Sequence, residues 1–213
     1  YEIGLAHGKL CREEILEINK PIFEIYDGIT EESKHWWSKA ENLEKQIPAE
    51  YIEEMHGIAD GSDIEYNKIL FLNTASTIGQ GRGCFAFSYR DKDSRIITFR
   101  QGDMPVETFL YKKMVLYIIK PEKGHGFAAI LNPGWVDGES GINEKGITVA
   151  QNNISIAQKE WEVMPITLLS RYILQYSKTI KEADQLLNTQ KQYPARLLFV
   201  SSPKSAAVFE IAN

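Results

Sequence analysis

A glycine-rich stretch at residues 79–83, Gly-Gln-Gly-Arg-Gly, divides this chain into two parts of different hydrophobic periodicity. Before it, apolar residues recur at the spacing of amphipathic helices. After it, they occur in short runs bounded by turn residues, as in strands. A chain of 213 residues is long enough for one substantial core. The pattern therefore predicts an α+β protein in which a helical segment, residues 1–83, precedes a sheet-bearing segment, residues 84–213.

The individual elements follow from periodicity, prolines and turn signals. Pro21 interrupts the first helical pattern and should kink or restart it, whereas Pro48 and Pro165 stand where a first helical turn tolerates proline. The predicted helices cover 8–26, 31–46, 48–59, a short stretch at 66–72, 165–176 and 180–187. The predicted strands cover 85–89, 95–100, 114–119, 126–131, 146–154, 195–201 and 206–211. Successive strands separated by turns imply an antiparallel meander.

Cys84 directly follows the glycine-rich stretch, and Arg100 and Asp103 come 16 and 19 residues after it. The intervening residues read as two strands joined by a polar turn, which would fold Arg100 and Asp103 back beside Cys84. A thiol attacks an acyl carbonyl only as its thiolate, so a site with these groups suggests an enzyme. The alternatives are a buried structural cysteine and a surface ion pair that closes the hairpin.

The spacing of Cys84, Arg100 and Asp103 resembles that of N-terminal nucleophile (Ntn) hydrolases that use cysteine, in particular choloylglycine hydrolases and penicillin V acylases. Further blocks resemble a second branch, the acyl-coenzyme A:6-aminopenicillanate acyltransferase family, and the last of them resembles an asparagine-bearing strand found in both branches. These blocks are residues 1–8, 51–61, 69–74 and 141–153. The resemblance implies a four-layer αββα sandwich of the Ntn-hydrolase type with an N-terminal helical segment, and no metal or organic cofactor.

The resemblance also implies that the protein cuts itself between Gly83 and Cys84. The new α-amino group, with an unperturbed pKa of roughly 7.7 to 8.0, would then serve as the base for the thiol of the same residue. Gly83 suits this step because a residue without Cβ permits strained backbone geometry. By the same resemblance, Arg100 would favour the thiolate and Asp103 would orient the amino group. Residues 1–83 would become an α-chain that stays associated with the β-chain.

An asparagine that donates to the oxyanion is the remaining implied site residue. The two branches place it one residue apart, so it falls on Asn152 or on Asn153. Because side chains alternate along a strand, only one of the two can point at Cys84.

The chain departs from both branches in two places. The penicillin acyltransferase branch carries Asn-Trp-Asp where this chain has residues 100–103, Arg-Gln-Gly-Asp. Both branches also continue past the hairpin at 195–211 into a segment with a second active-site asparagine, which this chain lacks. We expect either a fragment that is incomplete at its C-terminus, a site that is completed differently, or an inactive site.

Composition limits the partners. A formal charge of −5 and a pI near 5.5, with no Lys/Arg cluster and no zinc-ligand spacing, argue against nucleic acid and metal. Cys11 and Cys84 do not form a disulfide framework. No apolar run reaches membrane-spanning length, and the chain begins with Tyr1, so we expect that the true start is absent and leave the compartment open.

These observations predict a self-processing cysteine amidohydrolase or acyltransferase that acts on a linear amide through an acyl-thioester. Its partners would be a small acyl amide (a penicillin, a bile-acid conjugate, an N-acyl amino acid or a small peptide), with acyl-coenzyme A as an acyl donor in the second branch. A degenerate Ntn-fold binding protein is the first alternative. The second is an unprocessed cysteine hydrolase with a histidine base, drawn from His7, His35, His56 or His125.

Overall fold

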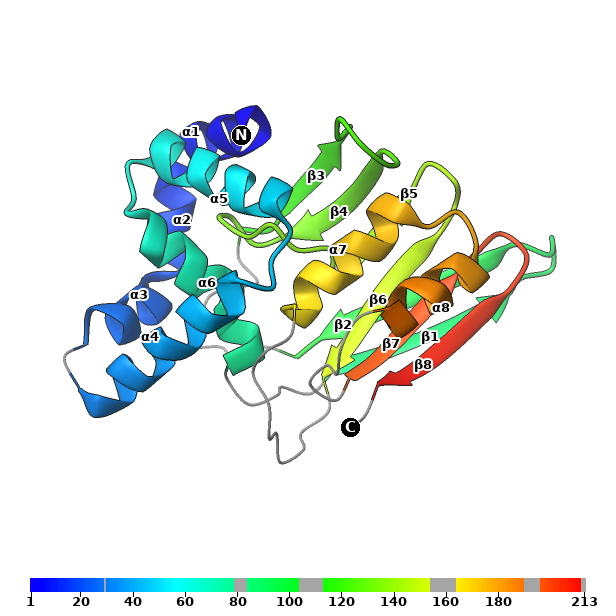
Figure 1. The fold of residues 1–213 in the computed structure, drawn as a ribbon. Helices are drawn as coiled ribbons and strands as arrows, with labels where there is room; N and C mark the ends of the chain where they lie inside the picture. Colours follow the sequence, from blue (N-terminus) through cyan, green and yellow to red (C-terminus); the bar gives the residue numbers. More distant parts are fainter. Residues whose placement is uncertain (29, 79–83, 104–112, 154–163, 190–195, 212–213) are drawn as a thin grey trace. The chain divides into compact units, whose positions relative to one another are not determined.

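The structure is a computed structural model that describes residues 1–28, 30–78, 84–103, 113–153, 164–189 and 196–211 (Figure 1). These residues fall into two compact units. One unit holds the helices of residues 1–78 together with residues 113–115 and 132–136. The other unit holds the rest of the described residues, which include the sheets and the two helices after residue 163.

The helical unit matches the predicted pattern closely. Its elements are α1 (Glu2–Leu10), α2 (Arg12–Ile18), α3 (Lys20–Asp27), α4 (Glu31–Glu44), α5 (Ala49–Ser62) and α6 (Tyr66–Ile78). The first helix begins earlier than predicted, and the chain bends at Cys11 and Asn19 before Pro21 enters the first turn of α3. Pro21 therefore restarts the helix, as expected from its missing N–H.

Helices α1 and α5 pack backbone against backbone through two pairs of glycines. A Cβ built on Gly57 would lie 2.1 Å from the carbonyl oxygen of Tyr1, and one on Gly4 would lie 1.9 Å from that of Glu54. Gly8 and Gly61, one helical turn further along, show the same close approach. Only residues without a side chain permit this spacing, so glycine at four-residue intervals sets the contact.

A loop at residues 132–136 is bound to the helical unit by side-chain amides. Asn19 Nδ2 donates to the carbonyl oxygen of Pro133 (2.9 Å), and Asn73 Nδ2 donates to that of Gly134 (3.0 Å). The N–H of Gly134 donates in turn to Nε2 of His7 (3.0 Å). Because all three side chains are buried, these bonds satisfy polar groups that would otherwise be costly.

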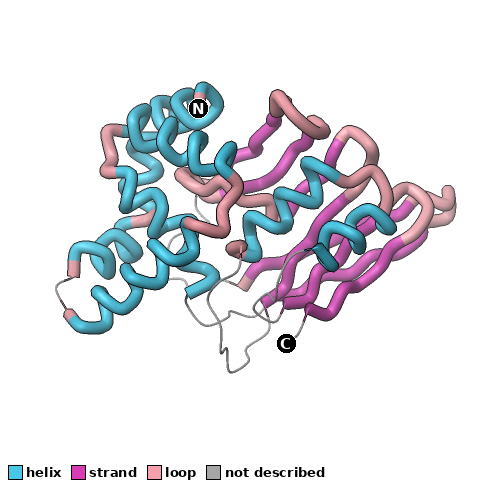
Figure 2. Tube along the Cα trace, viewed as in Figure 1, coloured by secondary structure: helices cyan, strands magenta, loops and turns pink. Residues whose placement is uncertain are grey.

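The sheet unit is built on a six-stranded sheet with its strands in chain order. Figure 2 draws the strands in magenta. Its strands are β3 (Val115–Ile119), β4 (Phe127–Leu131), β5 (Ser140–Asn143), β6 (Thr148–Asn153), β7 (Arg196–Ser201) and β8 (Ala206–Ile211). Strands β4 to β8 pair antiparallel, as the meander predicted. Helices α7 (Ile166–Tyr176) and α8 (Ile180–Thr189) pack against β5, β6 and β7 (Figure 1).

A separate hairpin of β1 (Cys84–Arg90) and β2 (Ile96–Gly102) packs against β6 and β7. It lies on the face opposite α7: Gln151 bonds to Ser170 of α7, whereas its neighbour Asn152 bonds to Ala86 of β1. The unit thus has helix, sheet and hairpin layers, which confirms the α+β sandwich. Its described elements include no helix on the outer side of the hairpin.

Hydroxyl groups fix the hairpin to the sheet. Thr98 of β2 shares hydrogen bonds with Ser88 of β1 (2.9 Å) and with Ser201 of β7 (2.7 Å), and Ser201 bonds further to Thr148 of β6. The polar residues of the hairpin therefore face the sheet. The opposite face is mostly aromatic and aliphatic, and Phe87 and Phe99 on it are 39% and 45% exposed.

Candidate active site

Cys84 is the first residue of β1, and the pairing register places it opposite Gly102, two residues beyond Arg100 on β2. Side chains at every second position of a strand share a face, so Arg100 points to the same side of the hairpin as Cys84. The Sγ of Cys84 lies 3.7 Å from Nη2 of Arg100, within hydrogen-bonding range for sulfur. The predicted hairpin is thus confirmed, and it brings the thiol and the guanidinium together.

The guanidinium of Arg100 is fixed by three further bonds. Its Nε donates to the carbonyl oxygen of Gln151 (2.6 Å), and Nη1 donates to Oγ of Ser140 (3.0 Å). Its Nη2, the nitrogen near Cys84, also donates to Oε2 of Glu139 (2.9 Å). The side chains of Arg100 and Glu139 are 14% and 17% exposed, so solvent screens this ion pair only partly. Such a fork of charge-assisted bonds gives Arg100 one orientation.

Further buried charges surround this pair. Burial raises the pKa of Asp137 well above its usual value, and the nearby charge of Glu139 raises it further, against the opposing effect of Arg100 and Arg171. Arg171 is buried on α7, with its guanidinium 5.5 Å from the ring centre of Phe127. A carboxyl with a raised pKa keeps its proton to a higher pH than an ordinary aspartate does.

Arg196, at the start of β7, contributes another buried cation on the same side. Burial lowers the pKa of its guanidinium, and the charges of Glu139 and Cys84 partly offset that effect. Cys84 thus lies 3.7 Å from the guanidinium of Arg100 and also acts on the pKa of Arg196 through its charge.

Asn152 contacts β1 at Ala86, two residues after the nucleophile candidate. In the amide orientation that satisfies both of its ends, its oxygen accepts from the N–H of Ala86 (3.1 Å) and its nitrogen donates to the carbonyl of Gln151 (3.0 Å). The amide nitrogen carries a second N–H, which has the chemistry of an oxyanion donor. The backbone of Asn153 continues β6, and its side chain is outside the described part of the structure.

Asp103 and Gly83 are the remaining predicted site residues. Asp103 is exposed just after β2, and its carboxylate accepts from Nε2 of Gln101 (3.1 Å). Gly83 lies outside the described residues, so the scissile bond proposed at Gly83–Cys84 has no geometry here.

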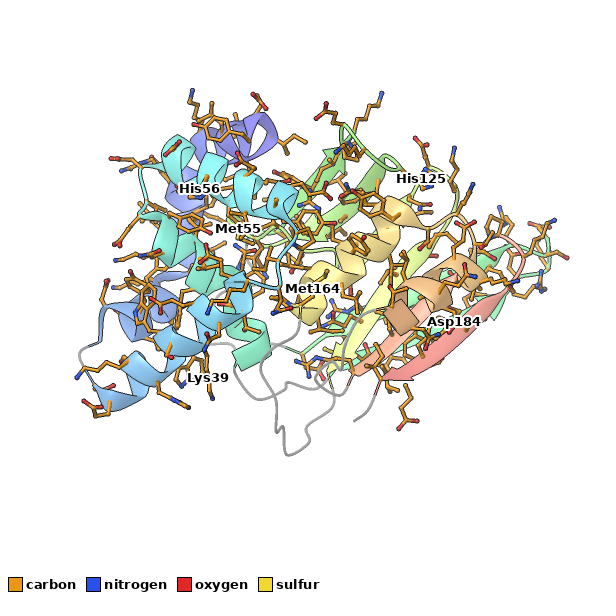
Figure 3. The ribbon with its side chains drawn as sticks, in the orientation of Figure 1. Lys39, Met55, His56, His125, Met164 and Asp184 are labelled. Carbon is orange, nitrogen blue, oxygen red and sulfur yellow. The ribbon has the colours of Figure 1, made fainter. Side chains whose placement is uncertain are left out.

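The histidines with described contacts engage other groups. His56 of α5, labelled in Figure 3, stacks on Tyr66 at 3.8 Å between ring centres. The Nδ1 of His125 lies 3.6 Å from Oε1 of Glu144. Among the residues that the structure describes, no three His, Cys, Asp or Glu side chains are grouped to hold a metal ion. None of the described helices is long and apolar enough to cross a bilayer.

Sequence reasoning did not identify the residues around Arg100. Asp137, Glu139 and Ser140 belong to a loop and a four-residue strand, β5, that was not predicted because its Gly and Asn have low strand propensity. A signal did exist for Arg171 and Arg196. Each is a lone charge in an otherwise apolar helix or strand, and such a residue is rarely buried unless it is paired.

The profile of the acyl-coenzyme A:6-aminopenicillanic acid acyl-transferase family matches residues 89–212, which is more than half of the chain. The chain belongs to this family. This membership confirms the resemblance to the acyltransferase branch and supports the wider Ntn-hydrolase relationship. The region of this chain that the family profile matches contains Arg100, Glu139 and Asn152, and Cys84 precedes that region.

Two curated relatives align with this acyl-transferase family member over most of its length. It is 25% identical over 254 residues to an uncharacterized protein of Archaeoglobus fulgidus, covering all of this chain and 42% of the relative. It is 23% identical over 236 residues to protein dcd1A of Dictyostelium discoideum, covering 90% of this chain and 51% of the relative. The chain spans about half the length of the curated relatives it matches.

Two solved structures are also similar. An N-acylethanolamine-hydrolyzing acid amidase ortholog of Caenorhabditis elegans has a TM-score of 0.49 at 13% identity, covering 61% of this chain and 64% of that one. Penicillin V acylase from Agrobacterium tumefaciens has a TM-score of 0.43 at 16% identity, covering 60% and 46%. The family assignment rests on the profile match, since TM-scores below 0.5 do not by themselves establish a shared fold.

Proposed function

We propose that the protein is a self-processing cysteine amidohydrolase or acyltransferase that cleaves a linear amide through an acyl-thioester on Cys84. The observation that carries the proposal is the guanidinium of Arg100, held 3.7 Å from the thiol by partly buried bonds. A fixed positive charge beside a thiol favours the thiolate, the form that attacks a carbonyl. Membership in a family named for acyl transfer supports the same chemistry.

The reaction would proceed in two steps. In the first, the thiolate of Cys84 attacks the carbonyl carbon of the amide, the C–N bond breaks, and the amine leaves with a proton. In the second, water or another amine attacks the thioester, and the acyl group leaves as an acid or as a new amide while the thiol is restored. Asn152, hydrogen-bonded to the second residue after Cys84, is the proposed donor to the oxyanion. An acyl-coenzyme A could load the same thiol in place of an amide.

Self-processing would provide the base. Cleavage before Cys84 would release an α-amino group, with an unperturbed pKa of roughly 7.7 to 8.0, on the residue that bears the nucleophile. In this proposal Asp103 orients that amino group, and the two chains remain associated after the cut.

The test is the intact mass of the full-length protein beside Cys84→Ala, with Cys11→Ala as the matched control. We expect two fragments split between Gly83 and Cys84 in the parent and in Cys11→Ala, and one uncut chain in Cys84→Ala. We also expect the parent to consume acyl amides from a panel of penicillin V, a bile-acid conjugate and an N-acyl amino acid. Cys84→Ala should lower that turnover by at least about 1000-fold. Full turnover in Cys84→Ala would overturn the proposal.

One observation favours the alternative of a degenerate binding protein. The carboxylate of Asp103 is exposed and accepts a hydrogen bond from Gln101. To orient the new amino group, Asp103 would need a different position in the processed chain. A binding protein would remain uncut, consume none of the panel, and still bind a member of it in both the parent and Cys84→Ala, as measured by calorimetry.

A further inference from the structure

Glu139 shares one nitrogen of Arg100 with the thiol of Cys84. Nη2 of Arg100 donates to Oε2 of Glu139 at 2.9 Å and lies 3.7 Å from Sγ of Cys84. The carboxylate of Glu139 and the thiol of Cys84 therefore face the same end of one guanidinium. The carboxylate is the nearer of the two, so its charge offsets part of the charge that the thiolate would experience.

Glu139 is itself firmly held. Its Oε1 accepts from Nε2 of Gln151 (3.4 Å), and its carbonyl oxygen accepts from the N–H of the same residue (3.0 Å). The preceding Gly138 lies so close to α7 that a Cβ there would be 2.6 Å from Cα of Arg171. The loop that carries Glu139 can thus approach the helix only with glycine at this position, which fixes the backbone next to Glu139.

We propose that Glu139 is a positioning residue that orients Arg100 toward Cys84 and, by offsetting its charge, sets the pH at which the thiol becomes reactive. This proposal rests on the proposed role of Cys84 as the nucleophile. It adds a residue that lies 55 positions after the cysteine and has no part in the Cys84, Arg100 and Asp103 spacing.

Other charged side chains act on the same groups. Burial and the charge of Glu139 raise the pKa of Asp137, whereas Arg100 on β2 and Arg171 on α7 lower it. The charges of Glu139 and Cys84 both raise the pKa of Arg196 on β7, against the effect of burial. Glu139 therefore interacts with the same two guanidinium groups, Arg100 and Arg196, as Cys84 does.

The test is the pH dependence of Cys84 alkylation by iodoacetamide, measured by peptide mass in the full-length protein with the Cys11→Ala change. Glu139→Gln removes the charge but keeps an oxygen that can accept from Arg100. We expect the midpoint of the alkylation curve to move to lower pH by about one unit, because a negative charge that disfavours the thiolate is lost from the same guanidinium. Ser140→Ala is the matched control, since it removes a neutral contact to Arg100 and should leave the midpoint unchanged.

Two further variants keep the proposal testable. Glu139→Asp retains the charge, so its alkylation midpoint should lie within about 0.3 of a pH unit of the parent midpoint. A merely structural role of Glu139 would not predict this agreement. Arg100→Lys replaces the fork by a single ammonium that cannot face both anions, and should raise the midpoint. An unchanged midpoint in Glu139→Gln, or equal shifts in Glu139→Gln and Ser140→Ala, would overturn the proposal.

Alkylation and turnover separate this proposal from the proposed function. If the parent consumes no amide but the midpoint shifts as expected, Glu139 tunes Cys84 and the proposed function fails. If amide is consumed and Glu139→Gln leaves the midpoint unchanged, the function stands and the role of Glu139 is wrong.

Discussion

Two contacts in the molecule are built on opposite principles. Helices α1 and α5 meet backbone to backbone at Gly4, Gly8, Gly57 and Gly61, with no side chains between them. The hairpin β1–β2 meets the six-stranded sheet through hydroxyl groups and the guanidinium of Arg100. The first contact should be sensitive to volume and nearly indifferent to charge. The second should tolerate small changes in volume but respond to the loss of a hydrogen bond or a charge.

The difference also explains where chemistry is placed. A contact fixed by shape needs no polar groups and offers none for reaction. A contact fixed by hydrogen bonds holds side chains such as Arg100 in one orientation, and the thiol of Cys84 lies at its edge. Polar groups that secure the hairpin are thus the same ones that surround the candidate nucleophile.

The largest effect is expected from Gly57→Ala. Intrinsic helix propensity would favour alanine by about 1 kcal/mol. However, the added Cβ would lie 2.1 Å from the carbonyl oxygen of Tyr1 and 2.7 Å from the backbone nitrogen of Leu5, so α1 must move away. We expect a net loss of about 2 to 3 kcal/mol in the free energy of unfolding, measured with urea.

Gly102→Ala is the matched control, because its Cβ would meet nothing closer than Arg100 Nη1 at 3.7 Å. It should change the free energy of unfolding by less than about 0.5 kcal/mol. If Gly57→Ala stabilises the protein, propensity outweighs the contact and the two helices are not held by close approach.

Most of the fold could be predicted from the sequence because each element carries its own period or turn signal. The helices, the meander and the β1–β2 hairpin follow from such local signals. Strand β5 could not be predicted, since four residues with low strand propensity become a strand only because β4 and β6 pair with them. The glycines that form the contact of α1 with α5 are visible in the sequence as two pairs spaced four residues apart. The sequence does not show that these two helices meet.

The candidate site likewise has one part that could be predicted from the sequence and one part that could not. The proximity of Arg100 to Cys84 follows from hairpin register and could be predicted. The placement of Glu139 and Asp137 depends on how a loop packs against α7, which no local period encodes. The role of each residue in catalysis remains a prediction for the experiments above.

A second prediction concerns the pH dependence of stability at the polar contact. Burial raises the pKa of Asp137 in the folded state, so above pH of about 3.9 the folded protein holds a proton that the unfolded chain has lost. Raising the pH then favours unfolding, and the stability from this group is lost as the pH rises through the raised pKa. Each unit of increase in the pKa contributes about 1.4 kcal/mol to that loss.

The side chain of Asp137→Asn does not titrate, so the parent should lose stability relative to this variant as the pH rises from about 4 through the raised pKa of Asp137. Urea unfolding of both proteins at several pH values measures the difference, and subtraction removes the titration of all other groups. If the parent instead gains stability relative to Asp137→Asn as the pH rises, Asp137 is ionised and paired with Arg171 or Arg100, whose charges act on it.

The smallest effect is expected from Thr98→Val, which tests the hydroxyl bonds of the hairpin without a change of charge. Valine has nearly the shape of threonine but leaves Ser88 and Ser201 without their bonds to Thr98. We expect a loss of about 1 kcal/mol in the free energy of unfolding. Ile97→Val, on the exposed face of the same strand, is the control and should cost less than about 0.5 kcal/mol. If Thr98→Val were as mild as this control, the hairpin would be placed by shape, as α1 and α5 are. The orientation of Arg100 would then depend on its own bonds alone.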